Sequence, residues 1–192
     1  MGKLVIRNDD VNPNTDLDKL NTMYSIIKEH TNAEIISAIN IFAKRSNKES
    51  VYPDVPFKDK PVDYFLDVDC MDRFKNVNLY RRASHGLYHF DHTKISKEWQ
   101  KFSIQVSCKM LCTTLFVPPF NRFSNETEEI CDELGINLLG RYEYWRSLDF
   151  EEFDSTHSFW YFHSWKFTLK QLKEKILNDV SSKKHRNRIQ VG

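Results

Sequence analysis

Short apolar runs typical of buried strands alternate along this chain with longer segments that have helical periodicity. The strand-like runs cover residues 3–8, 34–39, 64–66, 80–84, 114–117, 136–139 and 158–162. Strands that alternate with helices imply an α/β architecture with a mostly parallel sheet. Seven such runs without an internal repeat favour a barrel-like winding, although an open doubly wound sheet would give a similar pattern.

The segments between these runs have the start signals and apolar faces of helices. Predicted helices begin at Thr15 or Asp16, at Ser96, at Asn125 with Glu128 in a capping-box-like pair, and at Thr168 with Gln171. Their apolar faces consist of Leu17, Leu20, Tyr24 and Ile27, then of Trp99, Phe102, Val106 and Met110, then of Leu169, Leu172, Ile176 and Val180. The polar residues 44–61 contain three of the six prolines and predict a surface loop.

Length and composition are those of a single domain with an ordinary core. The chain has 192 residues, of which 40% are hydrophobic and 14% aromatic, enough to fold without disulfides or a structural metal. We therefore expect one domain over residues 1–192, with residues 183–192 as a flexible basic tail. Cys70, Cys108, Cys112 and Cys131 form no C-x-x-C pair, which favours reduced thiols in a cytoplasmic protein.

Charge and hydropathy give no indication of binding to nucleic acid or of a membrane-spanning segment. The formal net charge is +1, so no global field would recruit nucleic acid. The apolar run at the N-terminus is three residues long, too short for a signal peptide or a membrane span, and no later segment is long enough for a span. The sequence leaves the oligomeric state open.

Four polar clusters each follow a predicted strand. They are Asp9-Asp10, the segment from His85 to His89, Pro118-Pro119-Phe120-Asn121, and His163. Because parallel α/β folds gather their active sites at the carboxyl ends of the strands, these clusters are expected to converge on one edge of the sheet.

Asp10, His85 and His89 are candidate ligands of a divalent metal, with zinc as the default. If the His85–His89 segment is helical, the spacing of four places both imidazoles on one face, and Gly86 permits a tight turn. Two histidines and one carboxylate leave a coordination position open, as in catalytic zinc sites. His92 shares that helical face and could compete as a ligand.

Simpler interpretations of the same residues remain. Alone, the two histidines would be satisfied surface side chains, and Asp9 and Asp10 would be turn carboxylates that cap the following loop. Asp67-x-Asp69-x-x-Asp72 lacks the further ligand and the glycine of a calcium loop, so we reject that site. Cys108 and Cys112 lie on a predicted helix and indicate packing rather than a ligand pair.

The order of these motifs resembles that of the polysaccharide deacetylases of carbohydrate esterase family four. The matching segments are Arg7-Asn8-Asp9-Asp10, Ser84-His85-Gly86-Leu87-Tyr88-His89, Val117-Pro118-Pro119-Phe120-Asn121 and Phe162-His163-Ser164-Trp165. The resemblance covers roughly residues 3–180 and marks a compact, divergent member. It implies a distorted seven-stranded (β/α) barrel.

The resemblance also implies roles for single residues. Asp9 matches the catalytic base, and Asp10, His85 and His89 match the metal ligands. His163 matches the catalytic acid. Pro119 and Phe120 match the stretch that lines the acetyl pocket and offers a backbone N–H to the oxyanion. Predicted substrate contacts are Pro119, Phe120, Asn121, Trp145 and Trp165, with Tyr142 and Tyr144 as neighbours of Trp145.

One position departs from the family pattern. The family has an arginine directly before the double proline, where it holds the catalytic base, and Val117 stands there in this chain. Arg7, Arg122 or Arg141 could supply the missing guanidinium from another direction.

The expected function is the metal-dependent hydrolysis of an N-acetyl group on a sugar or polysaccharide precursor. Asp9 would take a proton from water, and His163 would protonate the departing nitrogen. Three alternatives stay open: a hydrolase of another amide or ester, a carbohydrate-binding or assembly protein without turnover, and a metal phosphoesterase. The charge balance and His163 argue against the last.

Overall fold

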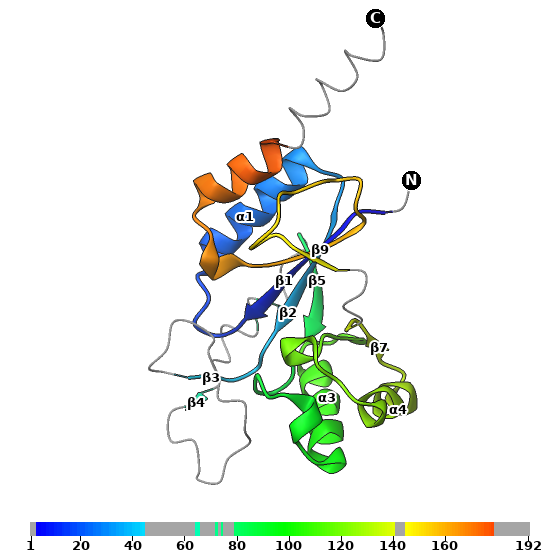
Figure 1. Cartoon of the computed structure of the whole chain (residues 1–192). Helices are drawn as coiled ribbons and strands as arrows, with labels where there is room; N and C mark the ends of the chain where they lie inside the picture. The colour runs from blue at the N-terminus through cyan, green and yellow to red at the C-terminus, as the bar shows by residue number, and fades with distance from the viewer. Residues whose placement is uncertain are drawn as a thin grey trace, which may run out of the picture.

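A computed structural model describes residues 3–44, 64–65, 72, 74, 79–140 and 145–178. Seven strands form one parallel sheet in the order β7-β6-β5-β2-β1-β9-β8 (Figure 1). The strands are β1 (Val5–Val11), β2 (Glu34–Ile39), β5 (Arg81–Ser84), β6 (Leu115–Phe116), β7 (Asn137–Leu138), β8 (Arg146–Ser147) and β9 (Phe159–His163). Within the described residues no ladder joins β7 to β8, so the wall is open there. This arrangement confirms the distorted (β/α)7 barrel.

Helices alternate with these strands, and all but α4 begin at the expected caps. They are α1 (Leu17–His30), α3 (Lys97–Met110), α4 (Asn125–Leu134) and the helical residues 169–178, together with the 3₁₀ turns η1 (His92–Lys94), η2 (Pro119–Asn121) and η4 (Ser164–Lys166). The Asp16 carboxylate accepts hydrogen bonds from the first turn of α1, and the Ser96 hydroxyl accepts one in α3. Thr168 and Gln171 cap the last helix reciprocally.

The main core lies between the sheet and the helix pair formed by α1 and residues 169–178, drawn in blue and in orange to red in Figure 1. The predicted apolar face of α1 is buried, and Met23 is buried with it. Leu172 and Ile176 of the last helix are fully buried in the same cluster. Helical periodicity thus identified the packing sides of both helices.

A smaller core joins α3 and α4 to β6, where Ile104, Cys108, Phe116, Ile130 and Cys131 pack together. The predicted apolar face of α3 was wrong for its first half, because Trp99 is 48% exposed and Phe102 50% exposed. The face that packs inward is largely polar, with the buried residues Gln100, Ser103, Ile104, Ser107 and Cys108. Its polar groups have buried partners, since the Thr127 hydroxyl donates to Gln100 and the Ser107 hydroxyl pairs with Ser84.

Two local predictions were also wrong. The run at residues 64–66 does not enter the barrel: β4 (Tyr64–Phe65) pairs antiparallel with β3 (Ala43–Lys44), and the seventh barrel strand is β8. Short runs carry little periodicity, so neither could be assigned to a sheet from sequence. In α4 the N-cap is Ser124 rather than Asn125, and it forms its capping box with Thr127. Gly135 ends this helix at φ 65°, as expected.

Several predictions concern residues outside the described part. These are the loop at residues 45–61, Asp67, Asp69, Cys70, Arg141, Tyr142, Tyr144, Val180 and the tail at 183–192. Among the described residues, no helix is long and apolar enough to cross a membrane.

Candidate metal centre and active site

The four polar clusters of the sequence meet at one edge of the sheet. Asp9 of β1 lies opposite His163 of β9, and Ser84, directly before His85, pairs with Ile39 of β2 and with Phe116 of β6. Because the strands are parallel, their carboxyl ends present these side chains on the same side. The expectation of convergence therefore agrees with the geometry.

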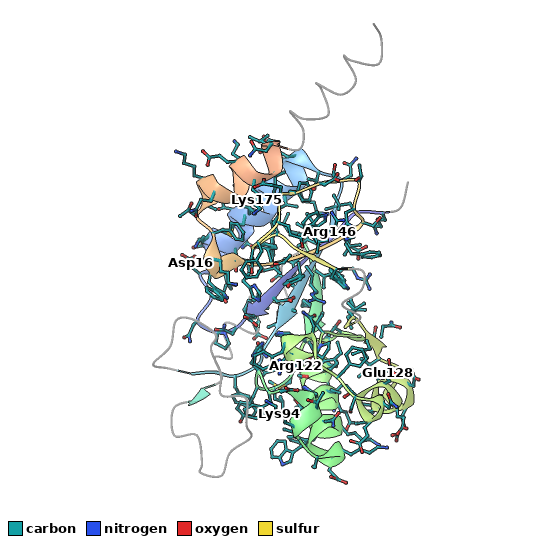
Figure 2. All side chains as sticks on the ribbon, in the orientation of Figure 1. Asp16, Lys94, Arg122, Glu128, Arg146 and Lys175 are labelled. Atoms are coloured by element: carbon teal, nitrogen blue, oxygen red, sulfur yellow. The ribbon has the colours of Figure 1, made fainter. Side chains whose placement is uncertain are left out.

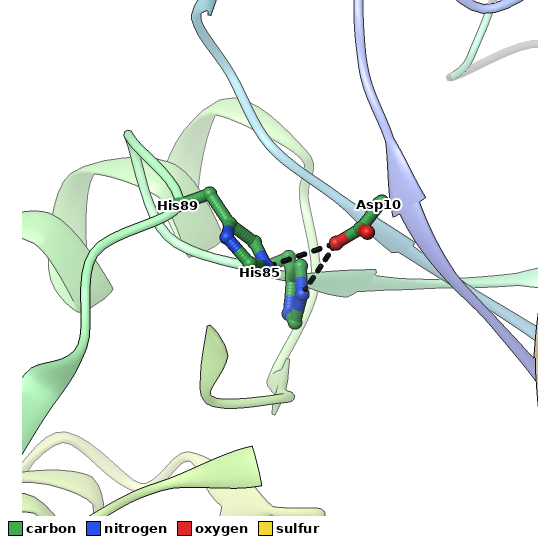
Figure 3. Close-up of side chains that lie close together, drawn as sticks. All are labelled: Asp10, His85 and His89. Carbon is green, nitrogen blue, oxygen red and sulfur yellow. Dashed lines mark ion pairs between the residues drawn. The ribbon is translucent and has the colours of Figure 1, made fainter. Parts of the chain in front are cut away.

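Asp10, His85 and His89 form a buried group that could hold a metal ion (Figure 3). The Asp10 Oδ1 atom lies 2.9 Å from His89 Nε2 and 3.3 Å from His85 Nε2. In a tetrahedral site with metal–ligand bonds of about 2.0–2.1 Å, the donor atoms lie roughly 3.4 Å from one another. A small increase in the distances between these three side chains would therefore admit a metal. One carboxylate and two imidazoles also match the donor set of catalytic zinc sites. The residues present fit a divalent metal.

Unusual backbone conformations deliver two of these ligands. Asp10 has φ 63° and lies where the pairing of β1 with β2 shifts register, between Asn8 and Val11. This irregularity lets Asp9 and Asp10 depart from the simple alternation of a strand. A left-handed aspartate is uncommon, and such strain gathers at functional sites.

The histidine segment is irregular, so the predicted helical geometry of the two histidines was wrong. His85 leaves β5 with its backbone N–H bonded to Ile39 O at 2.8 Å. Gly86 follows at φ 86°, and a Cβ there would lie 2.9 Å from Tyr88 O. The turn at Gly86, rather than helical spacing, brings His89 back beside His85.

Val117 orients the His85 ring through its backbone carbonyl. Its carbonyl oxygen lies 2.7 Å from His85 Nδ1, so that nitrogen carries the proton and Nε2 keeps its lone pair for the metal side. Burial lowers the pKa of His85, against the opposing effect of Asp10. The ring is thus kept in the neutral form that binds metals.

His92 lies outside the ligand group, although the sequence left it as a competitor. It is fully buried, its Nδ1 lies 3.1 Å from Phe90 O, and its ring packs edge-on against Phe116. Burial lowers the pKa of His92 to about 4, so it is a neutral packing residue.

Arg7 holds Asp9. The Arg7 Nε and Nη2 atoms donate to the two carboxylate oxygens of Asp9 at 2.7 and 2.8 Å, which is the bidentate geometry of strong guanidinium–carboxylate pairs. Arg7 is fully buried and also donates to Leu139 O and to Asn121 Oδ1. The Trp145 ring covers the guanidinium at 4.5 Å.

Three arginines were considered as substitutes for the arginine that is missing at Val117, and Arg141 lies outside the described residues. Of the two that the structure describes, Arg7 contacts Asp9. Arg122 instead pairs with the buried Asp91 at 3.1 Å, with Lys94 on the same carboxylate at 3.7 Å. Arg122 and Lys94 are labelled in Figure 2. Because Arg122 follows η2 and Asp91 precedes η1, this ion pair links the two turns.

His163 is oriented by Asp149, a residue that the sequence did not reveal. His163 Nδ1 lies 2.5 Å from Asp149 Oδ2, and His163 Nε2 lies 3.5 Å from Asp10 Oδ2. Burial alone would lower the pKa of His163, but Asp149 and the nearby Asp9 and Asp10 raise it overall. Asp149 lies in an acidic stretch (Asp149, Glu151, Glu152, Asp154), where nothing in the sequence singles it out.

The predicted substrate contacts surround this group in different ways. Pro119 is buried at the start of η2, and the Phe120 ring packs edge-on against His89 at 4.4 Å. Phe120 and Asn121 have φ values of 57° and 52°, so η2 stores strain beside the site. The Asn121 side-chain oxygen accepts a hydrogen bond from Arg7.

The tryptophans differ in exposure. Trp165 is 39% exposed and lies against the His163 ring at 5.7 Å. Trp145 covers Arg7 and packs against Phe159. Trp160 is fully buried, and its indole N–H faces Asp154 O and His157 O. Of the three, Trp165 is the most exposed, and it lies beside His163.

No protein-family model matches this sequence, and no curated protein sequence matches it either. Solved structures do match. A family 4 carbohydrate esterase from Streptomyces lividans, in complex with acetate, superposes with a TM-score of 0.60 at 10% identity, over 95% of this chain and 89% of that chain.

Two further structures give similar values. The family 4 domain of a multidomain xylanase from the hindgut metagenome of Trinervitermes trinervoides has a TM-score of 0.57 at 11% identity, over 95% of this chain and 85% of that one. A family 4 pseudoenzyme from Bacillus anthracis has a TM-score of 0.59 at 14% identity, over 94% and 62%. This chain has the fold of the family 4 carbohydrate esterases.

Proposed function

We propose that this protein is a divergent family 4 carbohydrate esterase that removes N-acetyl groups from a sugar with the help of a divalent metal, zinc by preference. The observation that supports it best is the buried group of Asp10, His85 and His89. A carboxylate held by Arg7 and a histidine held by Asp149 flank this group. These are the parts that metal-assisted amide hydrolysis requires.

A bound zinc ion would supply Lewis-acid polarisation of the acetyl carbonyl and would make water acidic enough to lose a proton near neutral pH. Asp9 would take that proton. Its two hydrogen bonds from Arg7 fix the plane of the carboxylate, which leaves a lone pair on each oxygen for the proton.

His163 would protonate the departing nitrogen, because an amide anion is a very poor leaving group. Its Nδ1–H donates to Asp149, so the second nitrogen, Nε2, points to the side of Asp10. Protonation of the ring at Nε2 is favoured by the raised pKa of His163. The base and the acid are thus separate groups, each with its own orienting partner.

Two alternatives use the same site. A hydrolase of another amide or ester would need the same metal group, base and acid. A sugar-binding protein without turnover is suggested by the likeness to a pseudoenzyme of this fold, and it would bind sugar without releasing acetate. The contact of Arg7 with Asp9 favours turnover, because it supplies the guanidinium that is missing at Val117.

The proposed function predicts about one divalent metal per chain and the release of acetate from an N-acetylhexosamine. Elemental analysis of the purified protein, coupled to an acetate assay across free, nucleotide-linked and oligomeric N-acetyl sugars, measures both. The proposal would be falsified if folded wild-type protein, prepared without chelators, contained no metal and bound none on titration.

Asp149→Asn should lower kcat by about 10²-fold or more, within the range of a positioned acid, with little change in KM. The raised pKa of His163 also predicts a shift in the pH profile. Activity that needs protonated His163 falls as pH rises through this pKa, and loss of the Asp149 charge should move that fall to lower pH.

The matched control is Asp154→Asn, which changes an aspartate of the same acidic stretch that caps a turn through Thr156 N. It should leave kcat and the pH profile unchanged. An Asp149→Asn enzyme with the wild-type profile would contradict the orienting role.

A further inference from the structure

A pocket of about 330 Å³ lies beside Asp10. It is bounded on one side by the loop that leads from β1 into α1 and on the other by η4. Its polar wall includes Asn12, Thr15, Lys19 and Ser164, and Trp165 closes it on the side of His163. Leu20 and Met23 of α1 also line it. The pocket therefore opens from the metal group toward the start of α1, where Figure 2 labels Asp16.

Lys19 is a cation in an unfavourable place for the fold. It is the third residue of α1 and its backbone N–H is bonded to the Asp16 carboxylate. Cations are destabilised at the N-terminus of a helix by the helix dipole. Within the described residues its ammonium makes no hydrogen bond or ion pair that would offset this cost. Lys19 thus lines the pocket, and its ammonium has no hydrogen-bond or ion-pair partner in the part of the chain that the structure describes.

The acidic groups of the pocket are already engaged, unlike Lys19. The Asp16 carboxylate accepts from the backbone N–H groups of Asp18 and Lys19 as the helix cap. The Asp10 carboxylate lies between His85 and His89. An anion that enters the pocket would therefore meet the ammonium and the positive end of α1, while both carboxylates keep their present partners.

Trp165 offers the surface on which a sugar ring can lie. Its side chain is 39% exposed, lines the pocket and contacts the His163 ring. An aromatic face packs well against the C–H face of a pyranose, and hydroxyls such as those of Thr15 and Ser164 suit its polar edge. The volume is at the lower end of the range for small-molecule sites, which suits one ring rather than several.

From these features we infer that the pocket binds one sugar unit carrying an oxyanion, a phosphate or a carboxylate, which pairs with Lys19 while the ring lies on Trp165. This inference rests on the proposed function, because it places the N-acetyl group of that sugar at Asp10, His85 and His89. It names the substrate class as acidic N-acetyl sugars.

Calorimetric titration of the metal-loaded, full-length protein tests the inference with three ligands: N-acetylglucosamine, N-acetylglucosamine 1-phosphate and N-acetylglucosaminuronic acid. We expect the wild type to bind at least one acidic sugar about tenfold or more tighter than the neutral one, as for a hydrogen bond to a charged group. Lys19→Met should reduce that preference to about twofold or less. Whether the phosphate or the carboxylate binds better identifies the source of the oxyanion.

The matched control is Lys109→Met, which removes an exposed lysine of α3 and should keep the full preference. Equal binding of all three sugars, no binding of any, or a preference that persists in Lys19→Met would overturn the inference. Acetate release is followed in parallel. Charge-dependent binding without acetate release contradicts only the proposed hydrolysis, whereas release without a charge preference contradicts only the subsite.

Discussion

His85→Ala is expected to abolish metal binding and, with it, acetate release. His85 supplies one of the three donors that lie together among the described residues, and its Nε2 lies 3.3 Å from the Asp10 oxygen. Loss of a residue that merely orients a ligand costs about 10–100-fold in metal affinity, so loss of a ligand itself should cost more. Elemental analysis after gel filtration measures the metal, and an acetate assay measures the activity.

Two controls separate metal binding from catalysis. Asp9→Asn should keep the metal and lose activity, because Asp9 contacts Arg7 rather than the ligand group. It also leaves Arg7 without its carboxylate, so some stability should be lost. His30→Ala removes a histidine at the end of α1 and should change neither metal content nor activity. A His85→Ala protein with full metal content would exclude the assigned ligand set.

Arg7→Met should both destabilise the fold and inactivate the site. The side chain of Arg7 is fully buried and that of Asp9 is 5% exposed. Removal of one partner from a buried ion pair typically costs about 3–5 kcal/mol, because the other charge stays buried and unpaired. The free energy of unfolding of natural domains is only about 5–15 kcal/mol, so this loss of stability is large. Urea unfolding of the metal-loaded protein measures the change.

A double variant separates the stability effect from the catalytic one. Arg7→Met combined with Asp9→Asn removes both charges, so it should recover much of the stability while remaining inactive. Arg7→Lys should recover little activity, since an ammonium cannot make the paired hydrogen bonds of the guanidinium. Arg146→Met, at an arginine whose partner Glu151 is 4.0 Å away on the surface, should change little. An active Arg7→Met enzyme would show that Asp9 needs no guanidinium.

Local sequence patterns predicted most of the barrel. Residues 34–39 form β2 as expected, because a run rich in isoleucine suits a strand buried on both faces. The start of α1 was predictable from Asp16, whose side chain caps the helix within three residues of chain. Gly135 and the Thr168–Gln171 pair are likewise short-range signals, and the structure confirms each of them.

Predictions failed where distant residues decide the outcome. Trp99 and Phe102 share a helical face with the partly buried Val106 and Met110, yet α3 buries Gln100 and Ser107 because Thr127 and Ser84 satisfy them. The spacing of His85 and His89 suggested a helix, whereas the segment turns at Gly86 and returns. The sequence predicted that the two histidines are neighbours but gave the wrong geometry for them.

By itself the sequence determined the alternation of strands and helices and the residue types that follow each strand. Parallel strands bring their carboxyl ends together, and this topological fact was enough to group Asp10, His85 and His89. Only the tertiary structure showed which groups orient the side chains of the site. The Val117 carbonyl orients His85, Arg7 orients Asp9, and Asp149 orients His163. These contacts depend on side-chain direction and on the register between strands, which no local pattern of residues encodes.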